Sequence, residues 1–442
     1  MAKRIGWFWG LFWVLLTACR LANQDAGGAT PSPTLAVPSP GATTAMVSPL
    51  ATGPAAATTP TPMVLRLWTT EEISPRSEVR GGAVLVEQLN SFDTTHPNLL
   101  LDVQLKVISG PGGVMSYLGT GRTVAPSVLP DVALLPSSYL AAATQAGYII
   151  PLDNLLPAEM VADLYPAAAN LSRVGNQLMG YPFAFTGLEH LAYNSTVITS
   201  TFPVTWTGLI SLPQTRLVLP TGDTANARLT LQLYLALGGT LTNEAGQPNL
   251  QAEPLRQTLI LLAQARLNNL ILLDSTNVTS NAQAWEMFQT GTAHIVPTGV
   301  RNFLDNRVFV ANSRYAALPG PSGPVPPLVE AWVWVITAQE TERQQLAAEL
   351  IAWLASETTM GNWSQVTAQL PTRRSAFAFW TMDTTYQSFL QAQLELAQPW
   401  PAAANSTVIS ALSEATFAVI EGSKTPDLAA EEAVARVMSG GQ

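Results

Sequence analysis

The chain has 442 residues, of which 47% are hydrophobic and 12% charged, and its formal net charge at pH 7 is −9. This balance excludes nucleic acid as an expected partner, because nucleic-acid binding depends on Lys and Arg side chains that neutralise phosphates. The single cysteine excludes an internal disulfide and a thiolate metal cage, and we expect neither a metal nor a cofactor.

The first residues have the layout of a secretory signal peptide. Basic residues precede an apolar run, residues 5–16, that is too short to span a bilayer. The only cysteine, Cys19, follows Leu16-Thr17-Ala18, which resembles the lipobox of bacterial lipoproteins, in which the cysteine is lipidated and becomes the mature N-terminus. The resemblance implies that residues 1–18 are a lipoprotein signal peptide and that a lipid on Cys19 anchors the protein to the cell membrane, outside the cytoplasm.

The segment that follows Cys19 predicts a disordered tether. Residues 20–62 are dominated by Pro, Ala, Thr, Ser and Gly and contain no aromatic residue. Such a segment buries too little apolar surface to offset its chain entropy. As a flexible coil its ends would lie roughly 35 Å apart, so we expect the remaining residues, 63–442, to stand clear of the membrane. That remainder is long enough for two domains.

The globular part begins with a strand, a helix and a second strand. Residues 64–68 form a short apolar run typical of a strand, and residues 84–92 carry apolar side chains at helical spacing. The His-Pro-Asn sequence at 96–98 ends this helix. Residues 99–107 alternate between apolar and polar side chains, which predicts a strand. The order predicts an α/β fold.

Later segments continue this pattern. The apolar runs at 132–135 and 331–336 predict buried strands. Residues 139–145 predict a helix that Gly147 closes.

Two longer helices are expected from side-chain spacing. Pro254 suits a first helical position, and apolar residues from there to Leu270 lie near one face. Thr341 is interpreted as the cap of a second helix, whose buried stripe includes Trp353 and Leu354.

Reactive motifs are scarce in the sequence. It contains no His-Glu-x-x-His, no Ser-x-x-Lys and no phosphate-cradling Gly-rich motif. Carboxylates keep a secreted, lipid-anchored glycan hydrolase open as an alternative, because such an enzyme needs only two of them and sequence spacing does not reveal their separation. The candidate carboxylates are Glu71, Glu72, Glu189, Asp223, Glu286 and Glu330.

A series of segments runs in the order of a known family. VLRLWTTEE resembles the family's first strand and loop, SFDTTHPNLLLDVQL the following turn and second strand, and LPDVALLPSSYLAAATQAGYIIPLDNLL its Pro-Asp-Val strand and ligand-facing turn. Later come GYPFAFTGLEHLAYN, VTWTGLI, LGGTLTNEAGQPNL, FQTGTAHIVPTGVRNF, LPGPSG and, after an Ala-rich helix, LPTRRSAF. From about Leu65 to Phe377 the chain thus resembles the extracellular solute-binding proteins of ABC importers, in the sugar-binding, maltodextrin-binding-protein-like class.

Two segments depart from the family's pattern. At 291–295 the chain has Gly-Thr-Ala-His-Ile where the family usually has Gly-Lys-Ala-Ala-Met. At 298–300 it has Thr-Gly-Val where the family often has Gly-Pro-Trp. The second departure removes a stacking surface that many relatives use for sugar.

The resemblance implies a two-lobed, periplasmic-binding-protein-like α/β fold of type II. Each lobe would be a mixed, mostly parallel sheet flanked by helices, and strands would cross between the lobes. The N-terminal lobe is expected at residues 63–184 plus 298–356, and the C-terminal lobe at 185–297 plus 357–442. The resemblance also implies a non-enzymatic protein, expected to be a monomer, that captures a small solute between the lobes and delivers it to the permease subunits of an ABC transporter.

Loops at the carboxyl ends of the strands are expected to line the cleft between the lobes. The candidate ligand-binding residues are Trp68, Thr70, Glu71, Ser137, Ser138, Tyr139, Phe185, Thr186, Thr298, Arg301, Glu330 and Trp332. In relatives the second lobe adds stacking residues after the last helical stripe, where this chain has Trp363, Trp380 and Trp400. The sequence does not choose among these three.

Two kinds of solute fit the candidate residues. A sugar presents apolar faces and a rim of hydroxyls, which aromatic planes and carboxylate, amide or guanidinium groups complement. A cationic ligand such as a polyamine stays open, because Glu71, Glu189 and Glu330 could pair with it and aromatic faces attract cations.

Overall fold

The computed structural model describes residues 62–222 and 227–440. The predicted signal peptide, Cys19 and almost all of the predicted tether lie outside these residues, as does Asp223. In the described part of the chain, no helix is both long and apolar enough to cross a membrane. Nor do three or more His, Cys, Asp or Glu side chains of that part gather in a way that could hold a metal ion.

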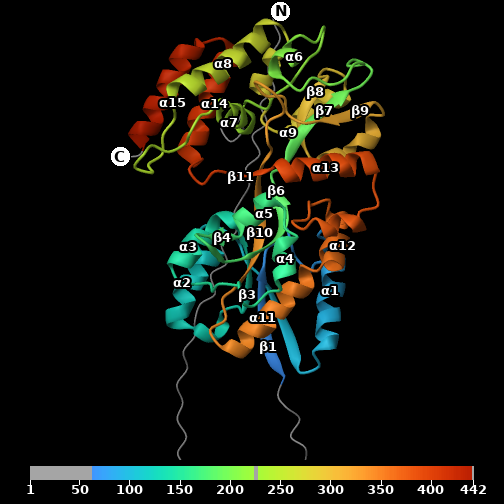
Figure 1. Ribbon diagram of the computed structural model, residues 1–442, viewed down its shortest axis with the longest axis vertical. Coiled ribbons are helices and arrows are strands. Elements are labelled where there is room, and N and C mark those ends of the chain that lie inside the picture. Colours follow the sequence, from blue (N-terminus) through green and yellow to red (C-terminus); the bar gives the residue numbers. More distant parts are fainter. Residues whose placement is uncertain (1–61, 223–226, 441–442) are drawn as a thin grey trace, which may run out of the picture. The chain divides into compact units, whose positions relative to one another are not determined.

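A mixed six-stranded sheet forms the core of the first lobe (Figure 1). Its strands are β1 (Met63–Thr69), β2 (Leu99–Leu105), β3 (Val132–Pro136), β6 (Tyr181–Thr186), β10 (Leu328–Ile336) and β11 (Gln398–Pro399). Strand β1 lies between β2 and β3 and is parallel to both. Strand β10 is antiparallel to β3 and β6 and parallel to β11. The four longer strands predicted from the sequence are therefore confirmed as neighbours in one sheet.

Helices cover this sheet because each has an apolar stripe. They are α1 (Gly82–Thr95), α2 (Val114–Val124), α3 (Leu140–Gln145), α4 (Ala158–Ala162), α5 (Pro166–Leu171), α11 (Thr341–Leu354) and α12 (Glu357–Thr367). In α1 the buried residues Leu85, Leu89 and Phe92 recur at helical spacing, and the helix ends at His96, directly before Pro97. Both features confirm the helix expected there.

A smaller antiparallel sheet lies at the centre of the second lobe, in the order β8-β7-β9. Its strands are β7 (Glu189–Asn194), β8 (Ile295–Gly299) and β9 (Ser313–Ala316). The helices around it are α6 (Trp206–Ile210), α7 (Arg228–Ala236), α8 (Ala252–Leu267), α9 (Asn281–Gln289), α10 (Val300–Asn306), α13 (Thr384–Leu396), α14 (Ser406–Glu421) and α15 (Pro426–Gly440). A short hairpin, β4 (Arg173–Val174) and β5 (Gln177–Leu178), completes the strands.

Successive residues of the small sheet enter two different hydrophobic clusters. Leu191 and Ile295 pack with residues of α8, α14 and α15, whereas Ala192 and Val296 belong to the cluster that continues into the large sheet. This division follows from the pleat, since neighbouring side chains of a strand point to opposite faces. The small sheet therefore serves both cores.

The chain crosses between the two sheets at identifiable points. Residues 187–188 join β6 of the large sheet to β7 of the small one, and residues 317–327 lead back from β9 to β10. The predicted two-lobed α/β fold is thus present, with segments that cross between the lobes. The small sheet, however, is antiparallel and not mostly parallel as expected for each lobe. The described residues form one compact unit.

Two details of the sequence prediction for α11 were wrong. Thr341 is the first helical residue and not the cap, which is Glu340 and makes no side-chain capping hydrogen bond. Trp353, expected in the buried stripe, is 36% exposed, and its indole Nε1 donates to the carbonyl oxygen of Gln88, 2.9 Å away.

A buried histidine ties helix α13 to the small sheet. His190 of β7 is 2% exposed, its Nδ1 lies 3.1 Å from the carbonyl oxygen of Leu191, and its Nε2 lies 2.7 Å from the hydroxyl of Tyr386 in α13. A neutral ring satisfies both contacts, with Nδ1–H donating to the carbonyl and Nε2 accepting from the hydroxyl. Burial lowers the pKa of His190 from its ordinary value of 6.5 to about 4.

This lowered pKa predicts a loss of stability in mild acid. Between about pH 6.5 and pH 4 the unfolded chain binds a proton at this histidine and the folded chain does not, so the free energy of unfolding should fall by about 3 kcal/mol across that window. Urea denaturation at a series of pH values measures it. The difference between wild type and His190→Gln isolates this residue, and equal pH dependence in the two chains would contradict the prediction.

Candidate functional site

The sheet topology brings most of the candidate ligand residues to one edge. Parallel β1 and β3 end at the same side, where Trp68 lies opposite Ala133, and antiparallel β10 places Trp332 opposite Pro136 and Glu330 opposite Thr186. Residues of this edge are Trp68, Thr70, Glu71, Ser137, Ser138, Tyr139, Phe185, Thr186, Glu330 and Trp332. The rule that strand ends gather at one edge therefore applies to residues that are up to 264 positions apart, Trp68 and Trp332.

Burial changes the role of several residues at this edge. Trp68 and Trp332 are only 3% and 9% exposed and belong to the hydrophobic core, so neither ring is open for stacking on a ligand in this structure. Thr70 is also buried, and the Ser137 hydroxyl accepts a hydrogen bond from the Ala331 amide at 3.2 Å. Trp68 packs edge-on against the ring of Tyr117 in α2, with the ring centres 6.2 Å apart. Several side chains that the sequence placed in the cleft are therefore enclosed.

The remaining residues of the edge are more accessible. Ser138 and Glu71 are exposed, and Glu71 forms an ion pair of 3.2 Å with Arg76. Tyr139, Thr186 and Glu330 are half-buried. Side chains of this group keep polar atoms available to a ligand.

The last two candidates come from the small-sheet side. Thr298 is fully buried, and its hydroxyl accepts a hydrogen bond of 2.9 Å from the Asn302 amide nitrogen. Arg301 is held by a hydrogen bond of 2.9 Å from its Nε to the carbonyl oxygen of Thr367. Arg301 lines a cavity of about 270 Å³ together with Phe185 and Thr186. The structure therefore joins these three candidates, whereas Thr298 is enclosed.

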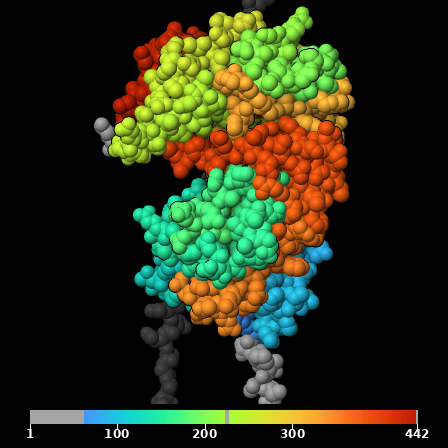
Figure 2. Space-filling model, viewed as in Figure 1, coloured from blue at the N-terminus to red at the C-terminus, as the bar shows by residue number. Residues whose placement is uncertain are grey.

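A second cavity, of about 210 Å³, adjoins the first through two shared residues. Glu189 and Asn281 line both cavities, and the second is also lined by Arg228 of α7 and by Trp400, which follows β11. Figure 2 shows the surface notched between the helices coloured red and yellow-green and those coloured blue-green.

Four side chains form a connected group in the second cavity. The Arg228 guanidinium carbon lies 4.5 Å from the centre of the Trp400 ring, and Arg228 Nη1 donates to the carbonyl oxygen of Leu328 at 2.8 Å. Arg228 Nε is 4.0 Å from Glu189 Oε1, to which Asn281 Nδ2 donates at 2.8 Å. We call Glu189, Arg228, Asn281 and Trp400 the polar-aromatic group.

The electrostatics of this group are nearly balanced. Burial raises the pKa of Glu189 above its ordinary value, and Arg228 and the Asn281 hydrogen bond oppose that rise. One guanidinium, one carboxylate and one amide thus line the same cavity as an indole ring. Such a set offers donors, acceptors and an apolar face to a ligand, with no large excess of charge.

Part of this group was not predicted from the sequence. Arg228 and Asn281 carry no sequence signal beyond standing at the first positions of α7 and α9, and Glu189 was predicted only as a candidate carboxylate for hydrolysis or for a cationic ligand. Of the three tryptophans left open, Trp363 and Trp380 are 1% and 5% exposed, whereas Trp400 is half-buried and lines the cavity.

The carboxylates considered for hydrolysis are dispersed. Glu72 and Glu286 are exposed, and Glu71 pairs with Arg76. Within the described ranges, Glu189 is the one carboxylate that lines either cavity. These cavities therefore hold no pair of described carboxylates.

Comparison with known proteins gives one family and a consistent fold. Residues 117–388 match a family described as bacterial extracellular solute-binding protein. The sequence has no match among curated proteins.

Three solved structures illustrate the likeness in fold. The sugar-binding protein MalE from Xanthomonas citri superimposes with a TM-score of 0.68 at 19% identity, covering 85% of this chain and 97% of that one. An extracellular solute-binding protein family 1 member from Alicyclobacillus acidocaldarius superimposes with a TM-score of 0.68 at 15% identity, covering 85% of this chain and 97% of that one. The extracellular solute-binding protein from Staphylococcus aureus in complex with maltose gives 0.66 at 14% identity, with coverage of 86% and 98%.

The position of Arg228 depends on a glycine in the crossing segment, which gives a testable prediction. Gly187 has φ +79°, and an added Cβ would lie 2.8 Å from Arg228 Nη2. The positive φ alone should make Gly187→Ala lower the free energy of unfolding by about 1–2 kcal/mol. The total loss should be larger than this backbone cost, because the new Cβ also forces Arg228 to move. Chemical denaturation measures the loss.

A matched control separates the two effects. Gly175 also has a positive φ, +59°, but an added Cβ there meets no atom within 4 Å. Gly175→Ala should therefore show the backbone cost alone. Equal losses in the two variants would mean that Gly187 does not hold Arg228 in place.

Proposed function

Because the chain belongs to the bacterial extracellular solute-binding proteins, we propose that it captures a sugar or oligosaccharide between its two lobes and delivers it to the permease subunits of an ABC transporter. The polar-aromatic group is the observation that carries the proposal. Its indole ring suits the apolar face of a sugar, and its guanidinium, carboxylate and amide groups suit the hydroxyl rim.

Solved structures of the same fold support this choice of solute. Their descriptions include a protein in complex with maltose, another that binds maltotetraose, and a receptor in complex with acarbose. All of these ligands are saccharides or saccharide analogues. We extend that ligand class to this chain because its cavity has matching chemistry.

Capture requires contacts from both sides of the crossing segment. Thr186 and Glu330 are supplied by the large sheet, whereas Glu189 and Asn281 belong to the small sheet and its helix α9. A solute that touches both sets binds the closed arrangement more tightly than the open one and shifts the population toward it. Hinge closure of this kind is the motion of periplasmic binding proteins as a class.

The alternatives receive less support from the same residues. A polyamine would pair with Glu189, but Arg228 lies 4.0 Å from that carboxylate and compensates its charge. A retaining or inverting glycosidase needs two carboxylates flanking the bond, and Glu189 is the one that lines the cavities in the described ranges.

The lipid anchor is a further part of the proposal. Cys19 would carry the acyl chains, and residues 20–62 would connect the anchor to the globular unit, outside the cytoplasm. Attachment to the membrane would keep the captured solute close to the permease, because a tether raises the effective concentration of the two partners.

Truncation of Trp400, the half-buried tryptophan of the second cavity, tests the solute site. Trp400→Ala should weaken the binding of maltotriose by about tenfold or more, since loss of an aromatic anchor in a binding pocket has effects of this size. Isothermal calorimetry measures the affinity, and chemical analysis of the same mixtures detects any cleavage products.

Trp353→Ala is the matched control, because Trp353 is also partly exposed but lies on α11, away from both cavities. Equal affinity in wild type and Trp400→Ala would remove Trp400 from the site. Binding of spermidine in place of every saccharide, or release of shorter saccharides, would replace the proposal with one of its alternatives.

Substitution of the only cysteine tests the anchor. Cys19→Ala should move the protein from the membrane fraction to the soluble fraction and remove the mass of the acyl chains, because no other cysteine is present to carry them. Cell fractionation and intact-mass spectrometry provide the measurements. A wild-type protein whose mass shows no lipid would refute this part of the proposal.

A further inference from the structure

A further cavity lies at the opposite edge of the large sheet from the candidate solute residues. It has a volume of about 640 Å³ and is lined by the beginning of β1, the residues before β3 and the residues after β10. These segments meet because β1 and β3 are parallel while β10 runs against them. A volume of this size suits a small organic ligand.

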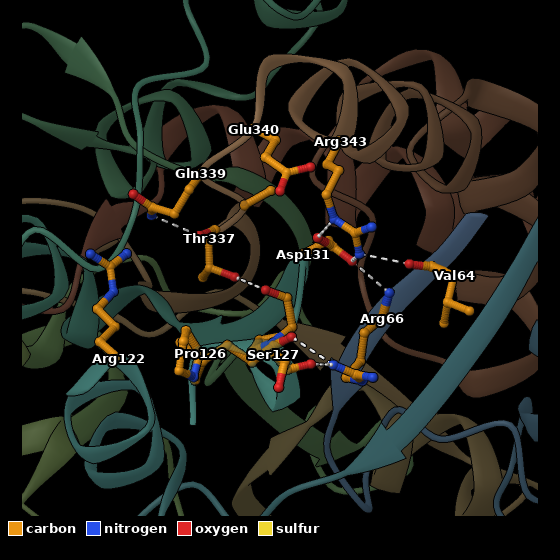
Figure 3. Close-up of a pocket in the computed structure, with 13 residues that line it drawn as sticks. Val64, Arg66, Arg122, Pro126, Ser127, Asp131, Thr337, Gln339, Glu340 and Arg343 are labelled. Atoms are coloured by element: carbon orange, nitrogen blue, oxygen red, sulfur yellow. Dashed lines mark hydrogen bonds and ion pairs between the residues drawn. The ribbon is translucent and has the colours of Figure 1, made fainter. Parts of the chain in front are cut away.

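Three arginines from three different elements line this cavity (Figure 3). Arg66 belongs to β1, Arg122 to α2 and Arg343 to the first turn of α11. In a chain with more acidic than basic residues, such a gathering is a local exception.

Protein contacts hold each guanidinium in place from one side. Arg66 donates through Nε to Asp102 at 2.8 Å and through Nη1 to the carbonyl oxygen of Ser127 at 2.6 Å. Arg343 donates through Nε to Asp131 at 2.7 Å, and Arg122 donates through Nη2 to the carbonyl oxygen of Tyr148 at 2.9 Å.

Each guanidinium also has N–H groups that donate to no protein acceptor in the described residues. Among residues 62–222 and 227–440, no acceptor is bonded to Nη2 of Arg66, to Nη1 of Arg343, or to Nε and Nη1 of Arg122. Arg66 and Arg343 are 20% and 26% exposed in their side chains, so these donors are fixed in direction and still reachable. Fixed guanidinium forks favour phosphate and carboxylate oxygens.

The negative groups of the cavity define the ligand further. Both oxygens of Asp131 are already bonded, to Arg343 and to the Arg66 amide. Glu340 also lines the cavity and precedes α11, whose amino-terminal end carries no side-chain cap. A free carboxylate beside three arginines suits a ligand that combines an anion with a hydroxyl or amine. Leu129 and Pro130 add an apolar wall.

We propose that this arginine cavity binds a phosphate ester whose organic part carries a hydroxyl or amine group. The free donors come from three elements, and a phosphate offers three oxygens to them, whereas a planar carboxylate offers two. Two sources share this chemistry, a soluble phosphate ester and a phospholipid headgroup.

The test uses the full chain with Cys19→Ala, which removes the proposed lipid attachment. Calorimetry with glycerol 3-phosphate probes the soluble source. Sedimentation with phosphatidylcholine vesicles, with and without phosphatidylglycerol, probes the headgroup. Arg122→Gln should weaken binding by at least about tenfold in whichever of the two assays detects it, because a hydrogen bond to a charged group is lost. Maltotriose affinity should not change, since Arg122 is remote from both solute cavities.

Arg266→Gln is the matched control. Arg266 is half-buried like Arg122 and likewise makes one hydrogen bond to a carbonyl, that of Glu421 at 3.1 Å, but it lies on α8. The proposal is supported if binding of glycerol 3-phosphate or of phospholipid vesicles is lost in Arg122→Gln and kept in Arg266→Gln. The assay that detects binding identifies the source of the phosphate. The proposal is overturned if the parent chain binds in neither arm, or if a folded Arg122→Gln binds as tightly as the parent.

Discussion

Pairing of β10 with two strands that are far away in the chain is the constraint on which the candidate solute edge and the arginine cavity both depend. Strand β10 pairs with β6 from Glu330 to Trp334 and with β3 from Trp332 to Ile336. This pairing places Glu330 opposite Thr186 at one edge of the sheet, and it carries residues 337–340 to the opposite edge, next to the beginnings of β1 and β3. One strand therefore positions a polar edge for a solute and an arginine cavity behind it.

The few cationic side chains are used as fixed parts of the structure. Asp131 is 4% exposed and bonds to Arg343 through both oxygens, and the removal of Arg343 would leave the buried Asp131 carboxylate without its main partner. Arg228 is fixed by the Leu328 carbonyl and by the Trp400 ring. Guanidinium groups held in this way lose little further freedom when a ligand arrives, which favours binding.

The strand-end rule predicted the edge of the sheet but not which of its side chains are open. Trp68 and Trp332 stand at the expected edge and are buried, and the Trp68 ring lies against Tyr117 of α2. Trp400 follows a two-residue strand with no pattern of its own, and it is the tryptophan that lines a cavity. The spacing of side chains along a strand predicts the face to which each one points, but it does not predict whether distant segments of the chain cover them.

The sequence by itself determined the α/β class, the order of the longer strands and helices and the family resemblance, because apolar periodicity and short motifs are local properties of the chain. Only the tertiary structure decided that Glu189, Arg228, Asn281 and Trp400 meet, since their contacts join residues up to 172 positions apart. It also decided that Arg66, Arg122 and Arg343 share a cavity, because that meeting follows from strand pairing, which no local pattern encodes.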